Sequence, residues 1–171
     1  ARVHARERLA TTADEFPDLL DEPVLWNGLY RTSFWRAKVH PIPEDVNYED
    51  QEPSLAAALH ARHIDVLATD VYSWRLPEGR VTRPQSKPRL ADLADRRTVL
   101  HRMRLMLDEH GASSVVRQHL LAVWLGRDLL MYAEKVPVAS PQFRDELQQI
   151  GAELTPLVDQ STWSTFGFWE R

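Results

Sequence analysis

Residues 26–51 carry the densest pattern of this chain: they begin Trp26-Asn27-Gly28-Leu29-Tyr30 and end Tyr48-Glu49-Asp50-Gln51. Aromatic and apolar residues gather on one side of 26–37, which predicts a short helix after a loop. Pro41 and Pro43 then predict an extended segment, because proline disfavours helix at the residue before it. Pro53 and Ser54 predict a helix to about residue 63. The Glu49-Asp50 pair therefore lies just before a helix start.

The residues on either side of this block predict further short elements. Residues 2–10 are charged and read as helical, and 14–22 is acidic with apolar residues at helical spacing. The β-branched or aromatic runs 64–67 and 71–74 predict strands, and two prolines within 80–88 predict a loop.

The sequence beyond residue 88 predicts three long helices. The first covers 89–110, with Gly111 as its C-terminal cap. Ser113 or Ser114 caps the second, which runs to about residue 135. Ser140 and Pro141 begin the third, which runs to about residue 158.

Composition describes an ordinary globular chain. Of its 171 residues, 43% are apolar and 27% charged, the net charge is −4, and there is no cysteine. Absence of thiols favours a reducing compartment, so the sequence predicts a cytoplasmic protein. No apolar run approaches the ~20 residues of a membrane-spanning helix, and no signal peptide is evident. A first residue other than Met fits a processed chain, and it favours a fragment of a longer chain.

A second block follows at a matching distance, with Ile64-Asp65-Val66-Leu67 and then Val71-Tyr72-Ser73-Trp74-Arg75. Over roughly residues 15–100, the two blocks together resemble the acceptor half of family-two GT-A glycosyltransferases that build actinobacterial wall and surface polymers. The resemblance implies an α/β fold: a partial, Rossmann-like GT-A half-domain with few short strands over 1–87, followed by a mainly helical extension over 88–171. It places the nucleotide-binding half before residue 1.

The resemblance also implies an inverting sugar transfer with Asp50 as general base and Glu49 beside it. The acceptor hydroxyl loses a proton as it attacks the anomeric carbon, so a carboxylate must lie next to it. By the same resemblance, Trp26, Asn27 and Tyr48 bind substrate. An isolated Glu-Asp pair, however, equally suits a helix N-terminus, where carboxylates complement the helix dipole.

Clustered cations predict a phosphate-binding lid. Residues 75–104 hold nine Arg or Lys against three Asp or Glu, a local charge of +6. In the resembled family this region covers the donor diphosphate, and Arg75, Arg80 and Thr82 are the candidates here. The arginines beyond residue 88 are expected on a solvated helix face.

Metal ligands are expected mostly outside this chain. The complete enzyme implied by the resemblance uses a divalent ion, Mn²⁺ or Mg²⁺, held by an Asp-x-Asp motif that the chain lacks. Ser73 stands where many relatives have a ligand histidine, and Gly28 replaces a usual lysine. His60 and His63 are one helical turn apart, but no third ligand accompanies them. The isolated chain is therefore expected to be inactive.

The expected partners are a nucleotide-sugar donor and a polysaccharide or polyol-phosphate acceptor of the teichoic-acid type, with peripheral association at the inner face of the cell membrane. Two other interpretations stay open. One is a non-catalytic helical module for protein interaction. The other is a nucleic-acid binder that uses the +6 stretch, although the rest of the chain carries about −10.

Overall fold

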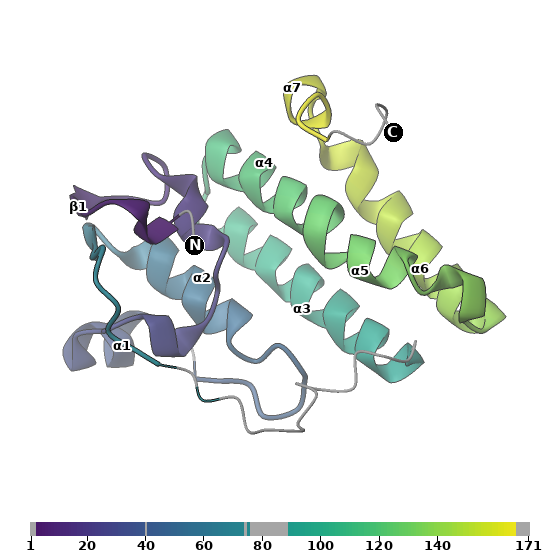
Figure 1. Ribbon diagram of the computed structural model, residues 1–171, viewed down its shortest axis with the longest axis horizontal. Helices are drawn as coiled ribbons and strands as arrows, with labels where there is room; N and C mark the ends of the chain where they lie inside the picture. Colours follow the sequence, from purple (N-terminus) through teal and green to yellow (C-terminus); the bar gives the residue numbers. More distant parts are fainter. Residues whose placement is uncertain (1–2, 40, 74, 76–88, 167–171) are drawn as a thin grey trace.

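The computed structural model describes residues 3–39, 41–73, 75 and 89–166. Within these residues the chain is mixed α/β and mainly helical, and its sheet is one antiparallel pair of short strands. This confirms the coarse prediction of few short strands followed by helices. Figure 1 shows α3 (Leu90–Glu109), α4 (Ser114–Val123) and α6 (Pro141–Leu154) running alongside one another, with the N-terminal elements at one end.

The first and third predicted long helices are confirmed. Helix α3 is followed by Gly111 at φ +58°, a left-handed conformation that glycine adopts without strain. Helix α6 begins with Pro141, and the side chain of Ser140 accepts a hydrogen bond from the Phe143 amide at 3.2 Å. After α6 come the 3-10 turn η6 (Thr155–Leu157) and the short helix α7 (Gln160–Trp163).

The second predicted helix is wrong as a single element. Helix α4 passes into a wider π-turn, η4 (Trp124–Asp128), then into α5 (Leu130–Ala133) and the 3-10 turn η5 (Val136–Val138). Gly126 lies within η4, and a Cβ there would come 2.8 Å from the Phe166 ring. The wider turn therefore accompanies a close approach of the C-terminal segment, and it also turns Asp128 inward.

The N-terminal segment differs from the predicted helix over 2–10. It forms a 3-10 turn η1 (Val3–Ala5) and strand β1 (Arg8–Thr11), which pairs antiparallel with β2 (Ile64–Val66). The β1 register contains one extra residue, and Ala10 there has φ +55° with its amide bonded to Asp65. Pairing over a long sequence separation has outweighed local helical propensity.

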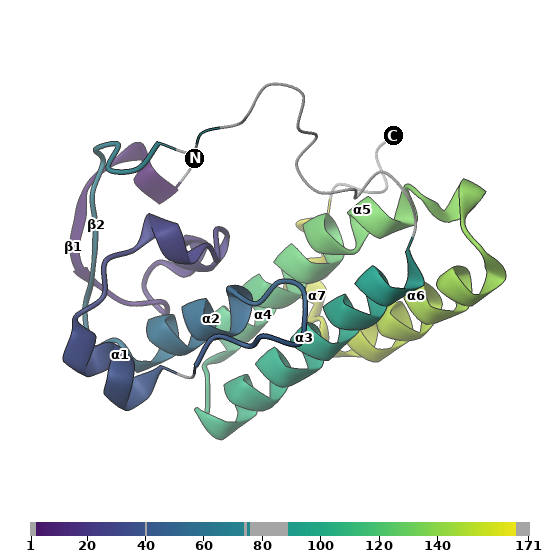
Figure 2. The ribbon, with the colours of Figure 1, turned by 90° about the horizontal axis from the view of Figure 1, so that it is seen from below.

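The strand predicted over 71–74 is wrong for its described residues, since 71–73 are irregular. The β1–β2 ladder ends at the Arg8–Val66 pair, and within the described part of the chain no partner strand continues alongside 71–73. Figure 2 shows β1 and β2 at the end of the molecule opposite the helical extension.

Short elements connect β1 to β2. They are η2 (Pro17–Leu20), η3 (Leu25–Asn27), α1 (Thr32–Lys38) and α2 (Gln51–His60). The helix predicted within 26–37 is confirmed only from Thr32 onward. The helix after Pro53 is confirmed and begins slightly earlier, at Gln51, which places Asp50 at its N-cap position.

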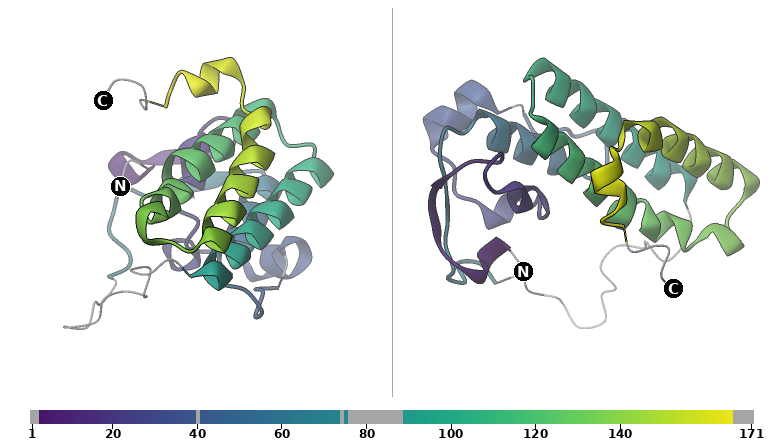
Figure 3. Two further views of the ribbon diagram at one scale, coloured as in Figure 1. Left: turned by 90° about the vertical axis from the view of Figure 1, so that its right-hand side faces the viewer. Right: turned by 90° about the horizontal axis from the view of Figure 1, so that it is seen from above.

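One apolar core joins the two halves of the sequence. Leu55 of α2, Leu93 of α3, Trp124 and Phe143 are among its most deeply buried members. Figure 3 shows α2 against α3 from two further directions. Among the described residues, no helix is both long enough and apolar enough to cross a membrane.

The structure assigns the cap of α4 to Ser113, whose side chain accepts a hydrogen bond from the Val116 amide at 3.3 Å. We expect Ser113→Ala to lower the free energy of unfolding by about 1 kcal/mol, since an amide of the first turn loses its partner. The neighbouring Ser114→Ala serves as control and should change it by less than ~0.5 kcal/mol. Urea denaturation of the three proteins measures both; equal losses would contradict the assignment.

Candidate functional site

The Glu49-Asp50 pair lies at the corner of a tight turn that leads into α2. The Gln51 amide donates to the Tyr48 carbonyl at 3.1 Å, which closes the turn around the two acidic residues. Both carboxylate-bearing residues are partly exposed, whereas Gln51 is buried. The turn therefore carries two partly exposed acidic residues, and the buried Gln51 fixes its end inside the protein.

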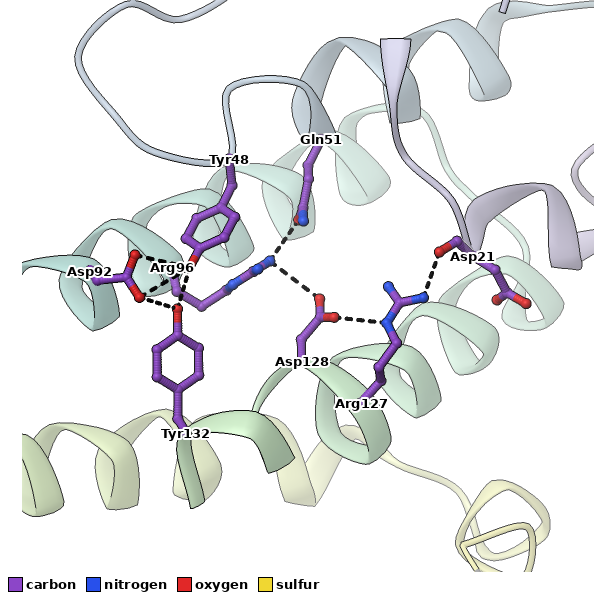
Figure 4. Close-up of polar contacts among 8 residues, drawn as sticks. All are labelled: Asp21, Tyr48, Gln51, Asp92, Arg96, Arg127, Asp128 and Tyr132. Carbon is purple, nitrogen blue, oxygen red and sulfur yellow. Dashed lines mark hydrogen bonds and ion pairs between the residues drawn. The ribbon is translucent and has the colours of Figure 1, made fainter. Parts of the chain in front are cut away.

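Tyr48 enters this turn in an unusual backbone conformation. Its φ is +68°, a left-handed value that costs a non-glycine residue about 1–3 kcal/mol. Its phenol oxygen lies 3.0 Å from Asp92 and 2.6 Å from the phenol oxygen of Tyr132, which itself donates to Asp92 at 2.9 Å. Figure 4 shows the two tyrosines converging on this carboxylate. These bonds hold the strained residue in place.

Arg96 of α3 lies at the centre of the same network and is only 2% exposed. Its Nη1 donates to Gln51 Oε1 at 2.9 Å and to Asp128 Oδ2 at 3.2 Å. Its guanidinium carbon lies 3.7 Å from the centre of the Tyr48 ring, in cation–π geometry. A single buried cation thus contacts both residues that flank the acidic pair.

Asp128 links the buried Arg96 to Arg127, which lies nearer the surface. It is 4% exposed and comes from the π-turn η4, where it also accepts from Arg127 Nε at 3.0 Å. Arg127 in turn donates to the Asp21 carbonyl, and the Asp21 carboxylate lies 2.7 Å from His119 Nε2. Figure 4 shows the row from Gln51 to Asp21. The buried positive charge of Arg96 is therefore balanced by an acid.

Burial raises the pKa of Tyr132, and its hydrogen bond with Tyr48 raises this pKa further; burial likewise raises the pKa of Tyr48. The folded state therefore keeps these phenol protons above pH 10.0, the ordinary pKa, where the unfolded chain releases them. The stability that these protons provide is fully present below pH 10 and is lost as pH rises further.

We accordingly expect the free energy of unfolding to fall above pH 10 by up to about 1.4 kcal/mol per pH unit for each such tyrosine. Tyr132→Phe should flatten this decline. Denaturant titrations between pH 8 and 11.5 measure the slopes, and identical slopes in the wild type and Tyr132→Phe would contradict the role given to Tyr132.

The structure brings together only some of the predicted site residues. Tyr48, Glu49 and Asp50 share one turn. Trp26 and Asn27 lie in η3, where Asn27 contacts His4 at 3.0 Å and Glu22 at 3.4 Å, and the Trp26 ring lies 6.5 Å from that of Tyr72.

The phosphate-binding lid stays a prediction. Arg75 is exposed at the edge of the described residues. Arg80 and Thr82, together with the rest of the segment expected to cover the donor diphosphate, lie outside them.

The acidic stretch around the start of α2 is paired with a cation. Arg102 of α3 contacts Asp45 and Glu52, each at 3.4 Å. The expectation that the later arginines form a solvated face is wrong for Arg96, which is buried and whose Nη1 donates to Asp128 and Gln51. Arg97, which is half-buried, pairs with Glu146 and Glu153 of α6.

In the structure, His60 lies against His110, the residue that follows α3. His60 ends α2 and contacts His110 rather than His63, with 2.8 Å between the two Nε2 atoms. His110 Nδ1 lies 2.9 Å from the Met106 carbonyl, which can only accept, so this nitrogen is the donor. A separate group, Asp18, Asp21 and His119, has ligand atoms within 4.8 Å of one another. Its His119–Asp21 contact already has hydrogen-bond geometry.

Sequence reasoning missed four residues of the network: Asp92, Arg96, Asp128 and Tyr132. The spacing of Asp92 and Arg96 by four residues places them on one face of α3. That signal was present, but the pair looked like an ordinary surface pair of a charged helix. Asp128 and Tyr132 depend on the π-turn, which a regular helical repeat does not predict.

No family model, curated protein or solved structure matches this chain. Its function therefore has to be inferred from the residues themselves and from their geometry.

Proposed function

We propose that this chain is the acceptor-side part of an inverting GT-A glycosyltransferase in which Asp50 is the general base. The observation that carries the proposal is the turn Tyr48–Gln51, which holds two partly exposed carboxylates at the start of α2 while its own flanks are anchored in the interior. The resemblance of the Trp26–Tyr30 and Tyr48–Gln51 motifs to this family adds a second reason.

The geometry suits proton removal from a sugar hydroxyl. A general base must lie within hydrogen-bond reach of the proton that it takes, and it contributes roughly 10² to 10⁴ in rate. The backbone of Glu49 and Asp50 lies within a turn that the Gln51 amide closes, which limits the reorganisation that a carboxylate needs in order to meet a bound hydroxyl. Asp50 then takes the proton of the acceptor hydroxyl as that oxygen attacks the anomeric carbon, and the nucleoside diphosphate leaves from the opposite face.

Other residues have supporting roles in this proposal. Trp26, half-exposed beside Tyr72, offers an aromatic face to an acceptor sugar, and Asn27 lies next to it in η3. Arg75, Arg80 and Thr82 contact the donor diphosphate. The nucleotide-binding strands and the Asp-x-Asp ligands of Mn²⁺ or Mg²⁺ belong to another part of the full-length protein. We assign Asp18, Asp21 and His119 no step in the reaction.

The proposal is tested by incubating the full-length protein with Mn²⁺, an oligosaccharide or polyol-phosphate acceptor and each of a set of nucleotide sugars. Release of nucleoside diphosphate that depends on both donor and acceptor supports it. If none of the donors is consumed and none binds more tightly than millimolar by calorimetry, the proposal is wrong. A non-catalytic helical interaction module would then account better for the chain.

A further inference from the structure

We propose that Arg96 is a positioning residue: its one guanidinium group sets the direction of the Glu49-Asp50 carboxylates by holding the residues on either side of them. The catalytic consequence of this inference rests on the proposed function. The contacts by which Arg96 holds Tyr48 and Gln51 do not depend on that function, and their effect on the turn can be measured separately.

Arg96 reaches both ends of one turn. Its guanidinium carbon lies over the Tyr48 ring, 3.7 Å from the ring centre, and its Nη1 donates to Gln51 at 2.9 Å. Tyr48 and Gln51 are the first and last residues of the turn that the Gln51 amide closes. With both ends fixed to one rigid planar group, the two residues between them have little freedom to swing.

Helix α3 also holds the other end of the Tyr48 side chain. Asp92, one helical turn before Arg96, accepts from the Tyr48 and Tyr132 phenols. Tyr48 is thus bound at its ring face and at its hydroxyl by two residues of a single helix. This double contact explains how a tyrosine keeps a φ of +68°, a conformation that it would leave if it were unsupported.

Stability alone does not require a guanidinium at this position. Replacing a buried ion pair by apolar residues of similar volume is often neutral or stabilising, because both charges pay for desolvation. The Nε of Arg96 is buried and lacks a hydrogen-bond partner within the part of the chain that the structure describes, which is a further cost. What an apolar side chain would not provide is simultaneous contact with an aromatic face, an amide oxygen and a carboxylate.

The substitution Arg96→Lys distinguishes the neutralisation of Asp128 from the contacts with Tyr48 and Gln51. The lysine ammonium can still neutralise Asp128, but a compact point charge cannot stack on Tyr48 and donate in the plane to Gln51 at once. Arg96→Lys therefore keeps the charge balance of the core and removes the clamp. The matched control is Arg97→Lys, one residue further along α3, where the arginine pairs with Glu146 and Glu153 instead.

The test measures amide hydrogen exchange and turnover in the full-length protein. In Arg96→Lys we expect exchange across residues 48–52 to accelerate at least about tenfold while α6 stays protected, since the turn opens locally. The kcat should fall roughly 10- to 100-fold with the KM for the donor unchanged, because a small misplacement of the base weakens the chemical step alone. Arg97→Lys should match the wild type in all three quantities.

A double variant separates positioning from a general structural effect. If Arg96 acts only through Asp50, adding Arg96→Lys to Asp50→Asn should slow turnover no further. An equal additional loss on that background would overturn the inference, as would unchanged exchange at 48–52. If Arg96→Lys does not fold, Gln51→Met removes one arm of the clamp with the ion pair intact, and the same outcomes apply. Faster exchange in a protein that consumes no nucleotide sugar would leave the clamp standing and refute the proposed function.

Discussion

Replacing Asp50 by asparagine is expected to reduce the kcat of the full-length protein by about 100-fold or more, because the amide cannot accept the proton of the attacking hydroxyl. Asparagine has nearly the same shape as aspartate and can occupy the same N-cap position of α2. Donor binding and folding should therefore stay close to those of the wild type. Initial-rate kinetics with saturating donor and acceptor, together with a thermal melt, measure these quantities.

Glu44→Gln is the matched control for this experiment. Glu44 is an exposed acid of the same loop, and its replacement removes one negative charge without altering the turn. It should change kcat by less than about twofold, since surface charges contribute little. Similar losses in both variants would show that the loop requires negative charge in general rather than a base at residue 50.

The largest effect on stability is expected from Asp128→Ala, which should lower the free energy of unfolding by about 3–5 kcal/mol. This change leaves the Arg96 guanidinium buried without its counter-charge. A buried, unpaired charge is strongly destabilising because it has lost water without gaining a partner. Asp108→Ala is the control. It removes an acid that pairs with Arg117 at the surface, at 2.5 Å, and should cost less than about 1 kcal/mol. Urea denaturation at pH 7 measures both.

A double replacement checks the physical reason for that cost. Arg96→Met combined with Asp128→Leu removes both charges and keeps similar volumes, so much of the lost stability should return. In the double variant the core would be stable while the clamp on the acidic turn is absent. If the double variant loses as much free energy of unfolding as the two single variants together, the cost comes from packing rather than from the unpaired charge.

The predictable parts of this fold are those in which local signals and tertiary packing agree. Gly111 and Ser140 ended and began helices where expected, since each satisfies backbone groups through its own conformation or side chain. The position of Asp50 at the start of α2 followed from Pro53 in the same way. Strand β2 was also predictable, because β-branched residues there face a buried surface.

The unpredictable parts depend on contacts between distant residues. Strand β1 exists because Arg8–Thr11 meets β2, more than 50 residues away, and a local reading of charged residues predicted a helix instead. The π-turn at Gly126 changes the direction of Asp128 by inserting one residue into the helical repeat, which sequence periodicity does not reveal. For this reason the acidic turn was anticipated, while the buried network that anchors it was not.

The anomeric configuration of the first-formed product tests the central claim most directly. The full-length protein is mixed with an α-linked nucleotide sugar that it consumes and with its acceptor, and the new glycosidic bond is followed by proton NMR before any rearrangement. A single general base with no covalent intermediate predicts inversion, so the product should be β-linked and should form at least about 100-fold more slowly in Asp50→Asn. An α-linked product, or β-linked product formed at an undiminished rate by Asp50→Asn, would contradict the role assigned to this turn.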